Sequence, residues 1–537
     1  GMVNRGEHSE ITTVAGDTVD SELSGNMIDL CPVGALTSKP FRYSARTWEL
    51  SRRKSVSPHD STGANLIVQV KNHKVMRVVP FENEAVNECW IADRDRFSYE
   101  ALNGEDRLTQ PMIKQGGAWK AVDWQTALEY VANGLKQIKD QHGAQSIGAL
   151  VSPHSTLEEL FLTGQLLRGI GSDNIDWRLR HAQFNAAEGV RWLGTSIAAL
   201  SDLQAALVVG SNLRKDHPLF AQRIRQATKK GCQVFALNAK VYDWAMPVTA
   251  SVVAAQDWAQ ALADVAAAVA QAKGVQAPVA GQANVEADAI AQALIAGERK
   301  AILLGNAAAH HAHAAELLAL ANWIGEQTGA TVGYLTEAAN TVGAQWVKAQ
   351  PQANGLHAAQ MIAGGLKATI LLNNEPALDS AAGQQALQGL NKSEMVVTLS
   401  PFKTNLDISD VLLPIAPFTE TSGSFVNAEG RVQSFHAVVK PLGETRPAWK
   451  VLRVLANLLG VQGVDYESSQ DVLRTAIGAD TTQVPAQVLS NATKTVIQVP
   501  AGPVAEPVVA SIYQLDSIVR RAPSLQLTAD ARQAQVG

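Results

Sequence analysis

Cysteine is scarce in this chain, with three residues in 537, at positions 31, 89 and 232. So few cysteines exclude a disulfide framework and suit a reducing compartment. The chain also has no Cys-x-x-Cys pair. It therefore holds no complete set of thiolate ligands for an iron–sulfur cluster, which needs four.

Long apolar runs and an excess of charge are also missing. No run approaches the roughly 20 apolar residues that a membrane-spanning helix needs, and the first residues contain no apolar signal core. Charged residues make up 18% of the chain, the formal net charge is −5 and the pI is near 6.2. We therefore expect a soluble chain with no nucleic-acid partner and no direct membrane insertion. If it works at a membrane, other subunits hold it there.

The residues that are present indicate a large α/β protein. A chain of 537 residues, 46% of them hydrophobic, exceeds what one core usually organises. A polar lead-in, residues 1–50, is followed by two β-rich runs at 66–70 and 74–79, which predict a small β unit.

Helices and strands alternate from Asp123 onward. Apolar residues recur at helical spacing from Trp124 to Ile138, with Asp123 as the N-cap. The alternation predicts largely parallel sheets. Strands are expected at 147–151, 205–209, 233–237, 300–304, 369–372 and 395–399, and helices at 219–230, 257–272 and 312–328.

Three later stretches are less regular. The Ala-rich region predicts a helix from 257 to 273, a flexible segment at 274–284 and a second helix after it. Residues 494–508 mix prolines with β-branched residues, which favours an extended edge strand or a surface segment. We expect residues 524–537 to fray.

Cys31 stands in the phrase Asp-Leu-Cys-Pro-Val-Gly-Ala-Leu-Thr, residues 29–37. A final cluster thiolate followed directly by proline is typical of ferredoxin-type iron–sulfur sites. Cys89 and Cys232 lie in unrelated sequence and do not complete the set. Either Cys31 is an ordinary thiol, or the chain is the back part of a longer protein whose front carries the other ligands.

The stretch DVLLPIAPFTETSGSFVNAEGRVQ, residues 410–433, resembles the molybdopterin oxidoreductase superfamily. Its members carry a similar strand ending in proline, then Glu, Gly and an Asn-x-Glu-Gly-Arg turn. Together with the Cys31 phrase, the chain is similar to the family of large peripheral-arm iron–sulfur subunits, the G subunits, of bacterial NADH-quinone oxidoreductase (complex I). Weaker phrases stand in matching order at 122–124, 210–218 and 373–376.

The resemblance implies an α/β fold of the molybdopterin-oxidoreductase type, as in domains 1–3 of formate dehydrogenase and DMSO reductase. This fold has parallel α/β sheets plus a small β domain. The implied units are 1–50, a remnant of an iron–sulfur ferredoxin-like region; 51–106, a small β domain of the 4Fe-4S type without a cluster; 107–195 with 346–450, a discontinuous α/β domain; 196–345, a second α/β domain; and 451–537, a C-terminal tail region.

Superfamily members hold a [4Fe–4S] cluster with four cysteines near their N-terminus. The resemblance places Ser57, Asp60, Ala64 and Ala92 at these ligand positions, and none of them supplies a thiolate. Cys89 stands three residues before the fourth position. We therefore expect this additional cluster to be absent and its β scaffold to persist.

The members bind molybdenum through Cys, selenocysteine or Ser in a loop that corresponds to residues 176–185. That loop has no cysteine; Ser172 lies too early, Thr195 and Ser196 lie too late, and His181 would be an unusual substitute. The tail after residue 450 also does not resemble the domain that grips half of the pterin dinucleotide. We expect no bound molybdopterin.

His310, His311 and His313 invite a zinc interpretation, since His310 and His313 would share a helix face. No carboxylate or cysteine stands at ligand spacing before Glu316, so we favour polar neighbours of a helix start.

Two further groups have structural as well as functional interpretations. The turn Gly210-Ser211-Asn212 follows a strand and is as readily a plain turn as a phosphate-binding one. Glu420 and Glu429 suggest acid–base work, but no His or nucleophile stands with them. For both glutamates we favour structural hydrogen bonds.

The resemblance implies a subunit of the complex I peripheral arm. That complex passes electrons from NADH through flavin and iron–sulfur clusters to quinone and couples this to proton translocation. Cys31 would ligate a [4Fe–4S] cluster in the intact subunit only. The chain itself would bind no cofactor, contain no catalytic residue and support other peripheral-arm subunits at the cytoplasmic side of the inner membrane.

Two rivals remain open. One is a molybdenum or tungsten pterin enzyme, such as a formate dehydrogenase α-subunit, which would need the metal ligand and pterin-gripping domain that the sequence does not display. The other is a stand-alone scaffold unrelated to respiration, which the Cys31 phrase disfavours.

Overall fold

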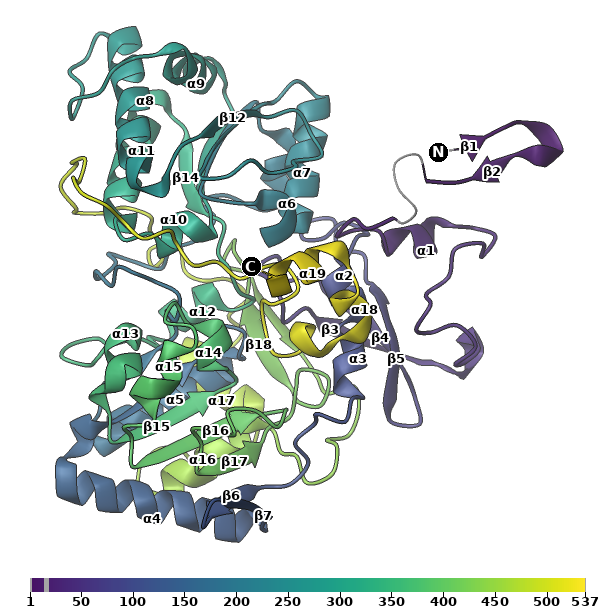
Figure 1. Cartoon of the computed structure of the whole chain (residues 1–537), viewed down its shortest axis with the longest axis vertical. Coiled ribbons are helices and arrows are strands. Elements are labelled where there is room, and N and C mark those ends of the chain that lie inside the picture. The colour runs from purple at the N-terminus through teal and green to yellow at the C-terminus, as the bar shows by residue number, and fades with distance from the viewer. Residues whose placement is uncertain (1, 14–18, 537) are drawn as a thin grey trace.

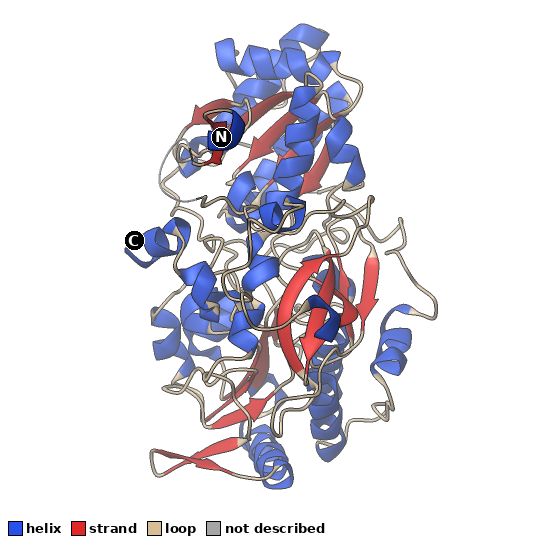
Figure 2. Cartoon of the chain, turned by 90° about the vertical axis from the view of Figure 1, so that its right-hand side faces the viewer, coloured by secondary structure: helices blue, strands red, loops and turns tan. Residues whose placement is uncertain are grey.

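Two largely parallel β-sheets with helices around them form most of the molecule. The computed structural model describes residues 2–13 and 19–536. A five-stranded sheet unit lies at the top of Figure 1, a seven-stranded sheet unit lies below it, and a small three-stranded sheet lies beside the lower unit. Figure 2 shows the same units following one another along the long axis.

The seven-stranded sheet has the order β7-β6-β17-β16-β15-β8-β9, and its core strands β17, β16, β15, β8 and β9 run parallel. From β8 the chain first adds β9 on one side, and it later adds β15, β16 and β17 on the other side of β8. The strand order therefore reverses between β8 and β15. Such a switch point opens a crevice at the carboxyl ends of the strands, where α/β sheets usually hold ligands. The strands are β6 (Met112–Gln115), β7 (Ala118–Ala121), β8 (Ile147–Val151), β9 (Ile175–Asp176), β15 (Ala368–Leu372), β16 (Met395–Ser400) and β17 (Val411–Pro414).

Helices cover both faces of this sheet. Asp123 caps α4 as the sequence predicts, because its side chain accepts a hydrogen bond from the Thr126 backbone N–H at 2.8 Å. Helix α16 packs against α4 and α5. The helices are α4 (Trp124–His142), α5 (Leu157–Ile170), α12 (Thr341–Trp346), α13 (Ala358–Gln360), α14 (Pro376–Asp379), α15 (Gln385–Leu390), α16 (Ala448–Leu458) and α17 (Ser469–Ile477).

The five-stranded sheet is parallel throughout, with the order β12-β11-β10-β13-β14. Its central strands are buried, which explains their continuous apolar sequences. The elements are β10 (Ala205–Val209), β11 (Gln233–Asn238), β12 (Thr249–Val252), β13 (Lys300–Leu304), β14 (Thr331–Tyr334), α6 (Leu213–Asp216), α7 (Pro218–Lys229), α8 (Trp258–Lys273), α9 (Val285–Ala296), α10 (Asn306–His310) and α11 (Ala314–Thr328).

The small β unit is an antiparallel sheet of β3 (Ser51–Val56), β4 (Asn65–Lys71) and β5 (Lys74–Pro80), followed by α2 (Asp93–Phe97) and α3 (Tyr99–Leu102). Asn72 and His73 form its two-residue turn with positive φ of 50° and 61°. Such φ values belong to the turns whose twist matches a β-hairpin. A further hairpin, β18 (Gly423–Val426) with β19 (Val432–Phe435), lies near β3.

Two short helices end the described chain, α18 (Pro523–Gln526) and α19 (Ala529–Val536). The expectation that residues 524–537 fray stays a prediction. Ser524 holds α18 in place, because its backbone N–H donates to the Glu100 carboxylate at 2.9 Å. Residues 494–508 contain no strand and run over the surface, as one of the two expectations for them states.

The N-terminal segment contains β1 (Met2–Val3), β2 (Glu10–Ile11) and α1 (Asn26–Leu30). Its end rests on the small β unit, since the Gly25 backbone N–H donates to Asp93 at 2.7 Å and the Asn26 amide donates to the Ile91 carbonyl at 2.8 Å. No helix among the described residues has the length and apolarity that a bilayer crossing requires.

We propose the division into units given by the sequence for the folded chain as well. The seven-stranded sheet draws its strands from two separate ranges, 112–176 and 368–414, with the five-stranded sheet at 205–334 between them. The sequence of the seven-stranded sheet is thus interrupted by that of the five-stranded sheet. This order supports one discontinuous unit with the second unit inserted into it.

Ile370 lies fully buried in β15, at the centre of the larger sheet. We expect Ile370→Ala to lower the free energy of unfolding by about 2–5 kcal/mol and Ile370→Val by about 0.5–1.5 kcal/mol, because a cavity remains. Hydrogen exchange in β8, β15 and β16 under increasing urea measures both values. As a control, Leu378→Ala at a half-exposed position should change little; equal losses at the two positions would contradict the assigned core.

Candidate functional site

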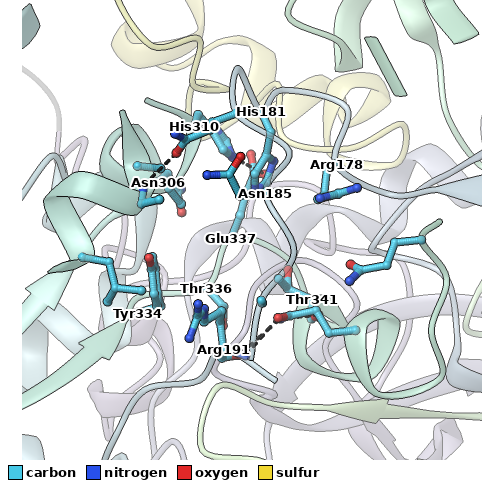
Figure 3. Close-up of a pocket in the computed structure, with 18 of the residues that line it drawn as sticks. Arg178, His181, Asn185, Arg191, Asn306, His310, Tyr334, Thr336, Glu337 and Thr341 are labelled. Carbon is cyan, nitrogen blue, oxygen red and sulfur yellow. Dashed lines mark hydrogen bonds and ion pairs between the residues drawn. The ribbon is translucent and has the colours of Figure 1, made fainter. Parts of the chain in front are cut away.

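A cavity of about 130 Å³ lies between the two parallel-sheet units. Its walls come from the loop after β9, helix α10, the first turns of α11, the turn after β14, helix α12 and residues 493 and 495. Figure 3 shows residues from several of these elements around the cavity. Because α10 follows β13, the cavity lies at the carboxyl ends of β13 and β14. It therefore has the position of a ligand site in an α/β sheet.

Glu337 provides the negative charge at this cavity. Arg180 Nη1 lies 2.9 Å from Glu337 Oε1, and His310 Nε2 lies 3.4 Å from Glu337 Oε2. Burial alone would raise the pKa of Glu337, but Arg180 and then His310 outweigh it and hold the pKa well below its usual range. The carboxylate is therefore ionised and already paired.

Three polar atoms at the cavity have no hydrogen-bond partner among the described residues: His181 Nδ1, Asn306 Oδ1 and Thr336 Oγ1. Burial lowers the pKa of His181 well below its usual range, and the neighbouring His310 lowers it further. The three atoms therefore present neutral hydrogen-bonding groups, which suit ordered water or a small polar molecule.

The residues at this cavity do not fit the molybdenum ligand of the resembled superfamily. The His181 ring packs against Trp177 and His310, with centroid distances of 5.3 and 4.9 Å. The described lining contains neither cysteine nor serine. Ser172 lies away from it and donates to the Ile147 carbonyl at 2.6 Å.

Thr195 and Ser196 also lie outside the lining of the cavity. The Ser196 hydroxyl instead accepts a hydrogen bond from the Ala199 backbone N–H at 3.3 Å. Among the described residues, no group of three or more His, Cys, Asp and Glu side chains is arranged to hold a metal ion.

The four positions that resemble cluster ligands are all buried in the small β unit: Ser57, Asp60, Ala64 and Ala92. Ser57 donates its backbone N–H to the Ala64 carbonyl at 2.9 Å and its hydroxyl to the Asp95 carboxylate. The Ala92 backbone N–H also donates to Asp95, at 3.3 Å. Asp95 therefore binds two of these positions, Ser57 and Ala92, and the Ser57 backbone joins Ala64 to them. None of the three offers a thiolate.

The fourth position, Asp60, forms a buried ion pair. Arg94 Nη2 lies 2.5 Å from Asp60 Oδ2, and both side chains are about 1% exposed. Burial disfavours the charged carboxylate, but Arg94 keeps the pKa of Asp60 below its usual value. Cys89 is exposed, and partial burial together with nearby glutamates raises the pKa of its thiol. This ion pair does not fit a [4Fe–4S] cluster.

Cys31 lies at the C-terminal end of α1, where its backbone N–H donates to the Met27 carbonyl at 3.1 Å. The backbone N–H groups of the following loop, that of Leu36 most, lower the pKa of the Cys31 thiol. Burial acts in the opposite direction, and the N–H groups of residues 33–35 add smaller lowering effects. N–H groups directed at a thiolate are the environment of a metal-binding or reactive cysteine.

The three histidines at α10 do not share a ligand site. His310 Nδ1 lies 2.8 Å from the Val508 carbonyl, and His311 Nε2 lies 2.9 Å from the Ala255 carbonyl. His313 donates its backbone N–H to His311 Nδ1 at 2.9 Å. These contacts agree with the structural interpretation of the sequence.

The turn at Gly210-Ser211-Asn212 uses its backbone N–H groups internally. They donate to the Leu237 carbonyl, the Asn238 amide and the Asp216 carboxylate, at 2.8, 2.9 and 3.0 Å. A Cβ on Gly210 would lie 2.6 Å from the Ala308 backbone nitrogen, so glycine permits this close packing. The turn is therefore a plain one.

Glu420 and Glu429 form structural contacts, as the sequence favours. Arg107 pairs with both oxygens of Glu420, at 2.7 and 2.9 Å. Glu429 pairs with Arg431 at 2.7 Å and accepts the Ile197 backbone N–H at 2.8 Å. Neither glutamate faces a nucleophile among the described residues.

A family model described as molybdopterin oxidoreductase matches residues 107–458, more than half of the chain. The chain belongs to the molybdopterin oxidoreductase family. Two further models match the N-terminal part. Residues 50–100 match an NDSU1/NuoG-like 4Fe-4S domain of NADH-ubiquinone oxidoreductase, and residues 1–37 match a ferredoxin-like domain of NADH-quinone oxidoreductase subunit 3.

Relatives of similar sequence are named as the G subunit of NADH-quinone oxidoreductase. Those of Rickettsia felis and Rickettsia conorii are both 30% identical, over 478 and 482 residues. Each alignment covers 88% of this chain and 65% of the relative. The chain thus spans just under two thirds of the length of these relatives.

The fold of the family is also found in acetylene hydratase from Pelobacter acetylenicus. That structure matches with a TM-score of 0.56 and 15% identity, over 79% of this chain and 72% of the other. At this identity the likeness shows the fold alone. The sequence-based prediction of an α/β molybdopterin-oxidoreductase fold with parallel sheets is confirmed.

Several residues at the candidate site carry no recognisable signal in the sequence. Glu337 lines the cavity, its partner Arg180 stands 157 residues away in the sequence, and neither belongs to a motif. Asn306 follows Gly305 after a predicted strand, which is the one local hint of a ligand-facing position.

We expect the three cysteines to differ in reactivity toward iodoacetamide. Cys31 should reach half its maximal rate at a pH below the value of about 8.5 for a free thiol, since its neighbouring N–H groups favour the thiolate. Cys89 should do so at a higher pH, and Cys232, whose pKa burial raises to about 11, should react only after unfolding. Peptide mass mapping across pH measures all three; a later midpoint for Cys31 than for Cys89 would contradict the assigned loop geometry.

Proposed function

We propose that this chain is the molybdopterin-oxidoreductase-like part of the G subunit of an NADH-quinone oxidoreductase. In this role it is a structural scaffold of the peripheral arm of complex I, on the cytoplasmic side of the inner membrane, and performs no catalytic step itself. The observation that carries the proposal is the alignment of 88% of the chain with relatives of that name.

The chemistry of the two family sites supports a scaffold without its own cofactor. At the positions of the cluster ligands stand a serine, a carboxylate and two alanines. Ser57 and Ala92 bond to Asp95, and Asp60 pairs with Arg94. In the loop that corresponds to the metal ligand, residues 176–185, the neutral ring of His181 lines the cavity and no cysteine or serine is present. The first set supplies no thiolate for a cluster, and the second supplies none of the ligands that the family uses for molybdenum.

Cys31 is the residue through which the chain would take part in electron transfer. It lies within the match to the ferredoxin-like domain, residues 1–37, and its loop favours the thiolate. We assign it as one ligand of a [4Fe–4S] cluster in the intact subunit, with the remaining ligands supplied by residues outside this sequence. Its partners are then the other peripheral-arm subunits, to which the cluster passes electrons on the way from NADH to quinone.

A molybdenum or tungsten pterin oxidoreductase, such as a formate dehydrogenase α-subunit, is the alternative that the family permits. The paired Glu337 and the absence of cysteine and serine from the described lining of the cavity disfavour it.

Replacement of Cys31 by Ala in the complete subunit, assembled in complex I, tests the proposal. We expect loss of one [4Fe–4S] signal in electron paramagnetic resonance, because alanine offers no ligand. NADH-to-quinone electron transfer should fall with it. Cys89→Ala is the matched control and should leave both unchanged, since Cys89 is exposed and lies outside the Cys31 phrase. A wild-type spectrum for Cys31→Ala would contradict the assignment.

A further inference from the structure

The C-terminal segment, residues 511–521, passes through the interior of the molecule. It follows the surface stretch 494–508 and enters between the small β unit and the seven-stranded sheet (Figure 1, yellow). Tyr513, Leu515 and Val519 are buried. Because these side chains are buried, the residues that surround them show which part of the fold the segment occupies.

These neighbours are the loops at the carboxyl ends of the strands. Leu515 lines one small cavity together with Ser152, Pro153 and His154, which directly follow β8. Residues 516–518 line another, together with Asn373, Pro401 and Ile415, which follow β15, β16 and β17. The segment thus lies along the switch-point crevice between β8 and β15, where sheets of this class usually hold a ligand.

Two arginines of the segment pair with carboxylates of the crevice. Arg520 contacts both oxygens of Asp379, at 2.8 and 3.1 Å. Arg521 Nη1 lies 2.6 Å from Glu375 Oε1, and its guanidinium lies over the Phe402 ring at 4.6 Å. Glu375 and Asp379 stand at the two ends of α14, shortly after β15.

Asp516 provides the opposite charge and binds the small β unit. Its Oδ2 lies 2.7 Å from His59 Nδ1, and both side chains are less than a tenth exposed. Its other oxygen accepts the backbone N–H groups of Ile518 and Val519, at 2.9 and 3.0 Å, which fixes the turn of the segment. The segment therefore joins the small β unit to the larger sheet.

We propose that the switch-point crevice is a peptide-binding site and that residues 511–521 of this chain are its ligand. The site takes a peptide with one carboxylate followed, four and five residues later, by two guanidinium groups. It offers one imidazole and two carboxylates in matching places, His59, Asp379 and Glu375. The peptide occupies the crevice and, without a cofactor, holds the small β unit and the seven-stranded sheet together. This inference does not depend on a role in complex I.

The test uses the whole chain with a protease site inserted at the exposed residues 501–503 and cut after folding. We expect the released piece, residues 504–537, to remain bound during gel filtration. Synthetic peptides of the same length, added in excess, then compete with a fluorescent copy of the wild-type piece for the cut chain. The peptide with Arg520→Glu should compete about a hundred-fold more weakly, because it places a carboxylate against Asp379 and leaves a buried charge unpaired.

Arg532→Glu in the peptide is the matched control, since Arg532 is exposed and forms no ion pair among the described residues. It should compete as well as the wild-type peptide. Because only the added peptide is altered, the folding of the chain is the same in every arm. Loss of the wild-type piece after cutting, or equal competition by the Arg520→Glu and Arg532→Glu peptides, would overturn the proposal.

Discussion

A charge that leaves water must meet an opposite charge or several hydrogen-bond partners, and this constraint governs how the units of the molecule join. Arg94 with Asp60, and Arg520 with Asp379, are nearly or fully buried pairs of this kind. Removing one partner of such a pair typically costs about 3–5 kcal/mol, because the other charge stays buried and unpaired. Paired charges of the protein itself therefore help to hold the interior between the small β unit and the parallel sheets.

This arrangement relates the fold of the family to the role that we propose. Parallel sheets with a switch point provide a crevice for a ligand, and the chain retains both the sheets and the crevice. In this chain, carboxylates, guanidinium groups and a segment of its own backbone stand there. The chemistry that we propose for the chain is instead at its edge, where Cys31 lies in a loop of inward-facing N–H groups. A large folded unit with one cluster ligand, Cys31, at its edge suits a scaffold that holds part of an electron-transfer path.

Local sequence patterns predicted much of the fold. The buried strands such as 205–209 were readable because strands covered on both faces are continuous apolar runs, and Asp123 marked the start of α4 because capping is a local interaction. The Cys31 phrase also indicated a cluster ligand from local sequence alone, because the cysteine and the proline that follows it are adjacent. In contrast, His59 and Asp516 meet across 457 residues, and Arg520 and Asp379 across 141. No local pattern encodes such pairs, so nothing in the sequence indicated that residues 511–521 are buried and held by long-range ion pairs.

The central claim is that the family sites of this chain hold neither metal nor pterin, because the residues there do not fit these groups. Elemental analysis of the purified full chain for iron, molybdenum and tungsten, with a visible absorption spectrum, tests it most directly. The account predicts a colourless protein without a stoichiometric amount of any of the three metals. Molybdenum or tungsten at one atom per chain, or an iron–sulfur absorption band, would contradict it.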